Sequence, residues 1–175
     1  MKFVTGNVKK WEEANAIVWG GLERVEIDLE EIQAIDVVDV VQYKAKAAYA
    51  VLWEPALCED VGLIVDAWNG LPGPQIKWFL QTVWQEGILK MLESFSNRDA
   101  QAVCCVAWYD GETVHHALWV CKGKITDSVR GDTSFGFDPI FIPDGYDQTF
   151  AEMSKEIKNQ ISHRYLAWNQ VRDLI

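Results

Sequence analysis

Residues 102–121 read AVCCVAWYDGETVHHALWVC, two apolar runs joined by Asp110-Gly111. Both runs are rich in β-branched and aromatic residues, and an Asp-Gly pair between such runs is typical of a tight β-hairpin turn. The pattern predicts antiparallel strands at 102–109 and 113–121. Residues 122–129 are predicted to add a third antiparallel strand.

Strands and helices alternate on the N-terminal side of this hairpin. Short apolar runs predict strands at 2–5, 25–29 and 56–59. Apolar residues spaced three and four apart predict two helices between these strands. The residues that mark the two helices are Trp11, Ala14, Val18, Val41, Ala45, Ala48 and Leu52. Gly20-Gly21 ends the first helix and Glu54-Pro55 the second.

Further helices are predicted around the hairpin. Turn residues at 69–74 precede a helical segment at 76–92, with a break near Gly87. The last helix is marked by Ile161, Tyr165, Trp168, Val171 and Ile175. Strand–helix alternation followed by a hairpin predicts an α/β fold with a mixed sheet, in a single domain over residues 1–175.

Length and composition predict a globular protein. The 175 residues, 49% apolar and 24% charged, are enough for a self-sufficient core and argue against disorder. The net charge of −10 repels nucleic-acid backbones. No apolar run approaches the roughly 18 residues of a membrane span, and MKFVTGNVKKWEE lacks the apolar core of a signal peptide. We expect a cytoplasmic protein that binds neither nucleic acid nor membrane.

The cysteines and tryptophans predict core packing. Cys58, Cys104, Cys105 and Cys121 form no C-x-x-C pair and no metal-ligand spacing. Adjacent residues of a strand point to opposite faces, so Cys104 and Cys105 are expected to be buried free thiols in a reducing compartment. Nine tryptophans are many for this length, and most lie on periodic faces. They are expected in the core.

The first candidate site is Thr5-Gly-Asn-Val-Lys-Lys10, between a strand and a helix. A helix N-terminus offers unpaired N–H groups and partial positive charge to a phosphate. Gly6 allows close approach, Thr5 and Asn7 can donate hydrogen bonds, and Lys10 lies one turn inside. The alternative is a capped helix with exposed lysines. The absence of G-x-x-x-x-G-K-[ST] excludes a P-loop.

The second candidate is the acidic pair in Cys58-Glu-Asp-Val-Gly62, together with Glu31. A carboxylate at the end of an apolar strand is costly to bury unpaired, so it binds a cation or lies in a wet cleft. Mg²⁺ prefers one or two carboxylates with substrate phosphates and water, as a nucleotide hydrolase requires. A solvated turn remains the alternative.

Two later segments are also candidates. In SFGFDPIFIPDGY, residues 134–146, Phe135 and Phe137 could form a base-stacking wall with Asp138 at its rim, or the segment could be an aromatic-packed loop. Lys158 to Arg164 opens the last helix, with Ser162 as N-cap and two cations in the first turn, against the helix dipole.

His115 and His116 are interpreted as structural, because they face opposite ways in mid-hairpin with no carboxylate nearby in the sequence.

Taken in this order, the four segments resemble the inosine triphosphate pyrophosphatase family. The matching stretches are FVTGNVKKWEE (3–13), CEDVGLIVDAWNGLPGPQIKWFL (58–80) and SFGFDPIFIPDGYDQTFAEMSKEIKNQISHR (134–164). The resemblance implies an elongated α/β fold whose central mixed sheet is flanked by helices, with a nucleotide cleft between two lobes. It also implies a homodimer that needs Mg²⁺, or Mn²⁺ as a substitute. Such enzymes hydrolyse non-standard purine triphosphates (ITP, dITP, XTP) to the monophosphate and pyrophosphate.

Residue by residue, the resemblance implies a complete site. Thr5, Gly6, Asn7, Lys10 and Lys44 match residues that bind the triphosphate. Glu31 and Asp60 match the Mg²⁺-associated carboxylates, and Asp60 also matches the general base. Phe135, Gly136, Phe137, Asp138 and Lys158 match the wall that contacts the nucleotide. Ser162, His163 and Arg164 match the run that reads the purine edge.

Two positions depart from the family pattern. Val61 stands where Ser or Thr is usual, which removes a hydroxyl near the phosphates but leaves a backbone N–H. Phe137 stands where Tyr or Trp is common. The competing hypotheses are a pyrophosphatase with another base preference, a nucleotide-binding module without catalysis, and a purely structural protein.

Overall fold

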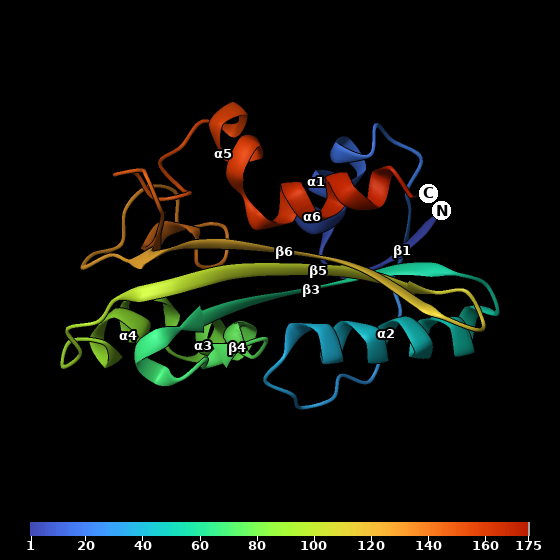
Figure 1. Ribbon diagram of the computed structural model, residues 1–175, viewed down its shortest axis with the longest axis horizontal. Coiled ribbons are helices and arrows are strands. Elements are labelled where there is room, and N and C mark those ends of the chain that lie inside the picture. The colour runs from blue at the N-terminus through green and yellow to red at the C-terminus, as the bar shows by residue number, and fades with distance from the viewer. Residues whose placement is uncertain (175) are drawn as a thin grey trace. The chain divides into compact units, whose positions relative to one another are not determined.

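The computed structural model describes residues 1–174, so Ile175, the last mark of the predicted final helix, lies outside the described residues (Figure 1). The helices are α1 (Val8–Ile17), α2 (Val37–Leu52), α3 (Ile76–Thr82), α4 (Trp84–Met91), α5 (Lys155–Ile161) and α6 (His163–Arg172). The strands are β1 (Lys2–Val4), β2 (Glu23–Val25), β3 (Ala56–Val65), β4 (Pro72–Gly73), β5 (Asp99–Tyr109), β6 (Val114–Ile125) and β7 (Phe141–Pro143). Two 3₁₀ turns span Asp66–Trp68 and Asp138–Ile140.

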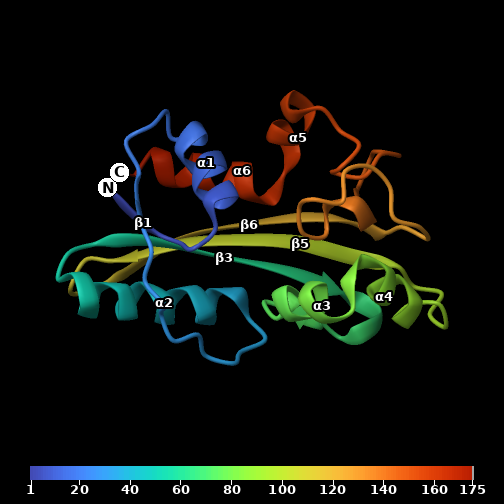
Figure 2. The ribbon, with the colours of Figure 1, turned by 180° about the vertical axis from the view of Figure 1, so that it is seen from behind.

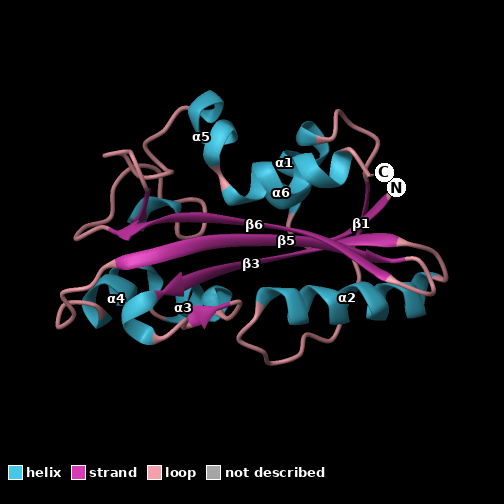
Figure 3. Cartoon of the chain, in the orientation of Figure 1, coloured by secondary structure: helices cyan, strands magenta, loops and turns pink. Residues whose placement is uncertain are grey.

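The strands of the described chain form one seven-stranded mixed sheet in the order β2-β1-β3-β5-β6-β7, with β4 paired to β3 (Figure 3). β1 is parallel to both β2 and β3, whereas β4 is antiparallel to β3 and β7 is antiparallel to β6. The predicted α/β fold with a mixed sheet flanked by helices is confirmed.

The chain divides into two compact units, and β3, β5 and β6 contribute residues to both. Unit 1 comprises Met1–Asp60, Cys104–Trp119 and residues 164–174; unit 2 comprises Val61–Val103 and Val120–His163. Within unit 1, α1 and α6 lie on one face of the strands and α2 on the other (Figures 1 and 2). Within unit 2, α3 and α4 lie on the face opposite α5.

Unit 1 is held by apolar residues on both faces of its strands. On one face, Phe3 of β1 packs edge-to-face against Trp168 of α6, with ring centroids 4.8 Å apart. On the other, the buried stripe of α2 follows the helical repeat at Val37, Val40, Val41, Ala45 and Ala48. Asp36 caps this helix, since its carboxylate accepts a hydrogen bond from the Val38 amide at 2.8 Å.

Unit 2 has its own core. Its largest fully buried side chains come from strands, helices and the segment before β7, and include Leu63, Ile88, Leu92, Ile125, Ile140, Phe141 and Phe150. Gly123 lets β6 pass close to β7, because a Cβ there would lie 2.9 Å from the Cα of Pro143.

Several predicted boundaries were wrong. The break in the 76–92 helix lies at Val83-Trp84 rather than at Gly87, because Trp84 adopts a left-handed backbone (φ 61°) that ends α3. Gly87 lies inside α4, where a Cβ would come within 2.5 Å of the Val83 Cβ. The predicted second strand, 25–29, lies instead at Glu23–Val25, the residues that pair with β1, and shares only Val25 with the prediction.

The third antiparallel strand predicted at 122–129 does not exist as a separate strand. β6 continues to Ile125, and its antiparallel partner there is β7. The segment 158–164 does not open a single helix either: Lys158 belongs to α5, and Ser162, in extended conformation, separates α5 from α6. His163 and Arg164 lie in the first turn of α6, as predicted.

The expectation that the tryptophans lie in the core was wrong. Only Trp168 is fully buried among those the structure describes, while Trp19 and Trp53 are 81% and 82% exposed. Trp78, Trp84 and Trp119 are also exposed. Trp19, Trp53 and Trp84 stand at helix ends with positive φ, outside the repeating apolar face, so helical spacing says nothing about their burial.

The four cysteines are free and buried, as predicted. Burial raises the pKa of Cys58 and of Cys105 to about 12, so both remain neutral thiols. No helix within residues 1–174 is both long and apolar enough to cross a membrane.

Candidate functional site

The residues of the β1–α1 turn cap the first helix of unit 1. The Asn7 side chain accepts a hydrogen bond from the Lys10 amide at 3.1 Å, and the Thr5 hydroxyl accepts one from the Asn7 amide at 3.1 Å. Gly6 is exposed, with open space where a Cβ would stand except for a Glu26 oxygen at 3.7 Å. The turn is therefore both a capped helix start and a surface that an anion can approach closely.

Glu59 and Asp60 lie in the middle of the long strand β3, not at a strand end as predicted. Successive side chains of a strand point to opposite faces of the sheet. In unit 1 the partners of Glu59 come from α1 and α6, and the main partner of Asp60 comes from α2. The adjacent carboxylates of Glu59 and Asp60 therefore lie in two different environments.

The Asp60 environment gathers three predicted site residues. The Lys44 ammonium lies 2.8 Å from a Glu31 oxygen and 3.4 Å from Asp60 Oδ1, and it donates to the Glu59 carbonyl at 3.3 Å. Asp60 is only 8% exposed, and its Oδ2 is buried with no hydrogen-bond partner among the described residues. A buried carboxylate oxygen without a partner is costly, so this atom is suited to receive a proton or a ligand.

Electrostatics agree with that geometry. Burial raises the pKa of Asp60 to about 6, although Lys44 and Lys10 act in the opposite direction. Burial lowers the pKa of Lys44, but the carboxylates of Asp60 and Glu31 more than compensate and leave it above its ordinary value. Unit 1 therefore holds a permanent cation beside a carboxyl group that titrates near neutrality.

Glu59 anchors a buried ionic network that the sequence analysis did not assign. Its carboxylate receives Arg164 Nε and Nη2, both at 3.1 Å, and Trp168 Nε1 at 2.7 Å, and it lies 3.1 Å from Lys10 Nζ. Arg164 Nη1 also donates to Glu13 at 2.8 Å. Burial raises the pKa of Glu59, but the Arg164 and Lys10 charges outweigh it and hold the pKa well below its usual range.

The network was missed because its partners lie far apart in sequence. Glu13 and Glu59 are 151 and 105 residues from Arg164. The available signal was the alternation of β3, which predicts that Glu59 and Asp60 face opposite sides. Arg164 is buried and its guanidinium contacts these two carboxylates, so its role in reading a purine edge stays a prediction.

Unit 2 gathers the aromatic segment. Lys158 Nζ forms an ion pair with buried Asp138 at 2.5 Å and lies 5.0 Å from the Phe135 ring centroid. Phe137 is buried rather than on the surface and stacks on His163, with centroids 5.6 Å apart. Of the two predicted stacking rings, Phe135 is the one with partial exposure. Phe137 packs like a core residue.

The remaining predicted residues of unit 2 have structural contacts. Gly136 has a left-handed backbone (φ 54°), which favours glycine, and its carbonyl accepts a hydrogen bond from Gln85 at 2.7 Å. The Ser162 amide donates to the Lys158 carbonyl at 2.8 Å. Val61, next in the chain after Asp60, packs against the unit 2 core.

His115 differs from the expectation in one respect. His115 does have a carboxylate nearby: its Nε2 lies 2.6 Å from Asp110 Oδ2, across the hairpin turn, and its ring stacks on Trp108. The Asp110 carboxylate also accepts hydrogen bonds from the amides of Glu112 and Thr113. These contacts stabilise the turn, so the structural interpretation of His115 fits the geometry.

The family is decided by a match over almost the whole chain. The model of the Ham1 family matches residues 1–174. The chain belongs to the Ham1 family. Its relatives include proteins named inosine triphosphate pyrophosphatase from Scheffersomyces stipitis and Candida albicans, 42% and 39% identical. Each alignment covers 99% of this Ham1 chain and 96% of the relative.

Solved structures agree with this assignment. The Staphylococcus aureus Ham1 protein has a TM-score of 0.85 at 28% identity, covering 99% of this chain and 97% of its own. A structure described as a nucleoside-triphosphatase or dITP/XTP pyrophosphatase from Mycobacterium abscessus has a TM-score of 0.79 at 27% identity, with 98% of each chain covered. The resemblance predicted from the sequence is confirmed.

The carboxylates of this Ham1 chain suit a Mg²⁺ ion that binds together with its substrate. Among residues 1–174 no group of three or more His, Cys, Asp or Glu side chains could hold a metal alone. Mg²⁺, however, commonly uses one or two carboxylates and completes its shell with phosphate oxygens and water. Asp60, whose Oδ2 has no partner in the part of the chain that the structure describes, and the nearby half-exposed Glu31 offer this kind of donor set.

Proposed function

We propose that this chain hydrolyses non-standard purine nucleoside triphosphates (ITP, dITP and XTP) to the nucleoside monophosphate and pyrophosphate, and so cleanses the nucleotide pool. The broader class, a nucleoside-triphosphate pyrophosphatase, follows from the Ham1 family and from the relatives at 42% and 39% identity. The observation that carries the proposal is the buried Asp60 carboxylate, with one oxygen on Lys44 and the other without a hydrogen-bond partner within residues 1–174.

In the proposed reaction Asp60 is the general base. It takes a proton from water as the water oxygen bonds to the α-phosphorus. The bond from that phosphorus to the bridging oxygen breaks, and its electron pair leaves with pyrophosphate. A base with a pKa of about 6 is ionised at neutral pH and still able to accept a proton.

The cations of unit 1 are proposed to stabilise the phosphates. Lys10 and Lys44 lie close enough to Asp60 to lower its pKa, so both can act on charge that develops near this carboxylate. Thr5, Gly6 and Asn7 offer the exposed turn at the start of α1 to the triphosphate. Glu31 and Asp60 would hold Mg²⁺, which neutralises phosphate oxygens when bound.

The base is proposed to contact unit 2 residues and the start of α6. Phe135 offers a partly exposed ring, and Lys158 a cation held by Asp138. Gly136, Phe137, Ser162, His163 and Arg164 are assigned here from the family resemblance. A 6-oxo group accepts hydrogen bonds where adenine has a donor, so an arginine or backbone N–H groups can discriminate between them. A homodimer and a cytoplasmic location also remain part of the proposal.

The test is a product assay with Mg²⁺ on ITP, dITP, XTP, GTP and ATP that scores pyrophosphate separately from orthophosphate. Pyrophosphate from the first three alone supports the reaction and the base preference together. Pyrophosphate from all five supports the chemistry and removes the proposed role of Arg164. Orthophosphate alone contradicts cleavage between the α- and β-phosphates. Tight ITP binding without any product would favour a binding module.

A further inference from the structure

A polar side chain lies on the buried face of α4. Gln85, Ile88 and Leu89 are the buried residues of this helix, at the spacing of one helical face. The helix starts at Trp84, whose backbone is left-handed, and Gln85 in its first turn is only 7% exposed. An amide on an apolar face is costly to bury unless it forms a hydrogen bond, so the partner of Gln85 is informative.

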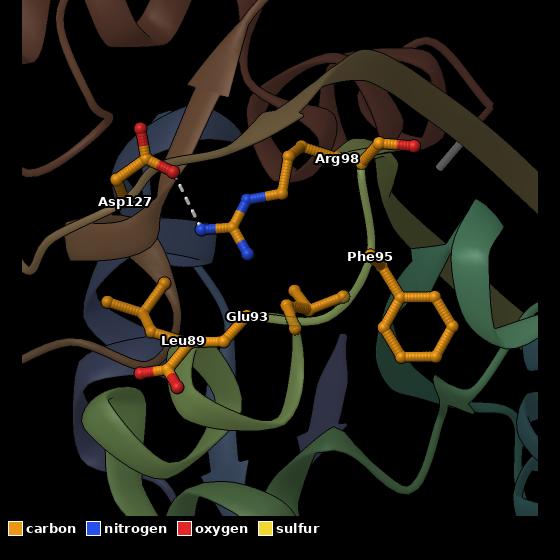
Figure 4. A pocket seen from close by; sticks show the side chains of 7 residues that line it. Leu89, Glu93, Phe95, Arg98 and Asp127 are labelled. Atoms are coloured by element: carbon orange, nitrogen blue, oxygen red, sulfur yellow. Dashed lines mark hydrogen bonds and ion pairs between the residues drawn. The ribbon is translucent and has the colours of Figure 1, made fainter.

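The pocket beside α4 does not account for this amide. The pocket is lined by the end of α4, the segment before β5 and Asp127, and Gln85 is not part of the lining. Figure 4 shows Arg98 of this pocket directed toward Asp127, and the two side chains form an ion pair at 2.9 Å. The Gln85 amide therefore serves a contact elsewhere in unit 2.

That contact is with the aromatic segment of unit 2. Gln85 Nε2 donates to the Gly136 carbonyl at 2.7 Å, across 51 residues of sequence. Gly136 lies in a tight turn in which the Asp138 amide donates to the Phe135 carbonyl at 3.3 Å. α4 also lies against the 3₁₀ turn that follows. A specific hydrogen bond thus joins the buried face of α4 to the turn beside Phe135.

Gly136 is the part of this turn that side-chain packing does not hold. Its backbone is left-handed (φ 54°), and apart from its chain neighbours no described atom lies within 4 Å of the place where a Cβ would stand. The two residues that follow are anchored by their own side chains, through ring stacking and an ion pair. Glycine has only backbone groups to anchor, and Gln85 anchors its carbonyl.

The residue before Gly136 is Phe135, whose ring is partly exposed. The Lys158 ammonium lies 5.0 Å from the centroid of this ring. An aromatic ring stacks on a base most favourably when its orientation is fixed beforehand, because ordering a mobile side chain on binding costs free energy. The backbone of the turn decides where the Phe135 ring points.

We propose that Gln85 is a positioning residue for the nucleobase: by holding the Gly136 carbonyl, its amide fixes the turn that presents Phe135. This inference rests on the proposed function, in which Phe135 contacts the purine. Gln85 acts through the turn rather than by touching the nucleotide. Loss of its amide should therefore weaken binding of the base and leave the proposed phosphate contacts of unit 1 unchanged.

Calorimetric titration of the full chain with inosine monophosphate (IMP), and separately with inorganic triphosphate, tests the proposal. Gln85→Met keeps the length of the side chain but removes the donor. It should weaken IMP binding about three- to tenfold, as expected for the loss of one hydrogen bond, and leave triphosphate binding within about twofold. In ITP turnover it should raise KM by a similar factor with kcat nearly unchanged.

The matched control is Gln81→Met, the same change at an exposed glutamine of α3, which should alter neither binding constant. Equal IMP binding by Gln85→Met and the wild type overturns the proposal. Equal weakening of IMP and triphosphate binding also overturns it, because a general loss of structure would affect both ligands. If Gln85→Met does not fold, Gln85→Leu takes its place with the same expectations.

A double-mutant cycle shows whether Gln85 acts through Phe135. Phe135→Leu removes the flat ring, so in this background Gln85→Met should weaken IMP binding by less than about twofold. Full additivity of the two changes in binding free energy would mean that Gln85 acts by another route, and it overturns the proposal.

The wild type distinguishes failure of this inference from failure of the proposed function. A wild-type chain that neither binds IMP nor hydrolyses ITP overturns both. Wild-type turnover of ITP to pyrophosphate, with no effect of Gln85→Met on IMP binding or KM, overturns the positioning role alone.

Discussion

Glu59 and Asp60 are chain neighbours, yet their pKa values are shifted in opposite directions. Arg164 and Lys10 hold Glu59 ionised, whereas burial moves the pKa of Asp60 up to about 6. The difference comes from the pleat of β3, which directs the two side chains to different partners. The residue suited to accept a proton is therefore Asp60, and the residue suited to hold the structure is Glu59.

Replacement of Asp60 by Asn should abolish most turnover while the protein stays folded. Loss of a general base costs about 10²- to 10⁴-fold in rate, and Asn is nearly isosteric. ITP turnover and a circular dichroism spectrum measure the two effects. Turnover within threefold of the wild type would show that Asp60 is not the base.

Asp60→Asn should also change how the stability of the folded protein depends on pH. Because the folded pKa of Asp60 is raised from 3.8 to about 6, the native state binds the proton more tightly than the unfolded state. The wild type should therefore lose stability as pH rises from about 4 to 6, a loss that Asp60→Asn does not share. Thermal melts at pH 4, 5, 6 and 7 should show the Tm of the variant rising relative to the wild type, and a constant difference would contradict the raised pKa.

Replacement of Glu59 by Gln should instead destabilise unit 1. The change leaves the buried Arg164 without its carboxylate on β3, and breaking a buried pair costs about 3 kcal/mol. Urea unfolding measures the loss, with Glu26→Gln as a control at an exposed carboxylate. An unfolding free energy equal to that of the control would mean that the network contributes no stability.

Several helices end or begin at tryptophans with left-handed backbone. Trp53 closes α2 at φ 57° with its side chain 82% exposed, a position that usually favours glycine. Trp53→Gly should stabilise the chain by about 0.5–1 kcal/mol, because the left-handed cost is removed and little burial is lost. Trp53→Ala keeps the backbone cost and should not stabilise. Equal effects in urea unfolding would contradict this explanation.

Elements with local signals could be predicted from the sequence. The hairpin follows from Asp110-Gly111, and the start of α1 from Asn7, whose side chain makes the cap. The continuation of β3 through two carboxylates could not be read locally, since their partners include residues more than 100 positions away. The position of the break at Trp84 was missed for a different reason: sequence spacing does not reveal a positive φ.

The predicted mixed sheet is confirmed, whereas several tryptophans expected in the core lie at the surface. The core of each unit consists mainly of aliphatic and phenylalanine side chains. Among the described tryptophans, only Trp168 is fully buried. Of the predicted site, the sequence could assign residue types and order through the family resemblance. It could not assign the partners, such as Glu59 to Arg164, that decide which side chains are held in place.

Removal of divalent metal should stop turnover without unfolding the chain. The core of each unit is apolar, and residues 1–174 hold no group of three metal-ligating side chains that would fix an ion structurally. Excess EDTA should abolish ITP hydrolysis. It should shift Tm by less than about 2 °C, because a metal raises Tm only when it binds the native state and we expect Mg²⁺ to bind this chain mainly together with substrate. Full activity in EDTA, or a large fall in Tm, would contradict the proposed role of Mg²⁺.

Hydrolysis of ITP in ¹⁸O-labelled water, followed by mass spectrometry of both products, shows which phosphorus the water attacks. Water activated by Asp60 and directed at the α-phosphorus places the label in the nucleoside monophosphate, and the pyrophosphate remains unlabelled. Label in pyrophosphate or in orthophosphate would mean attack at another phosphorus and would contradict the account.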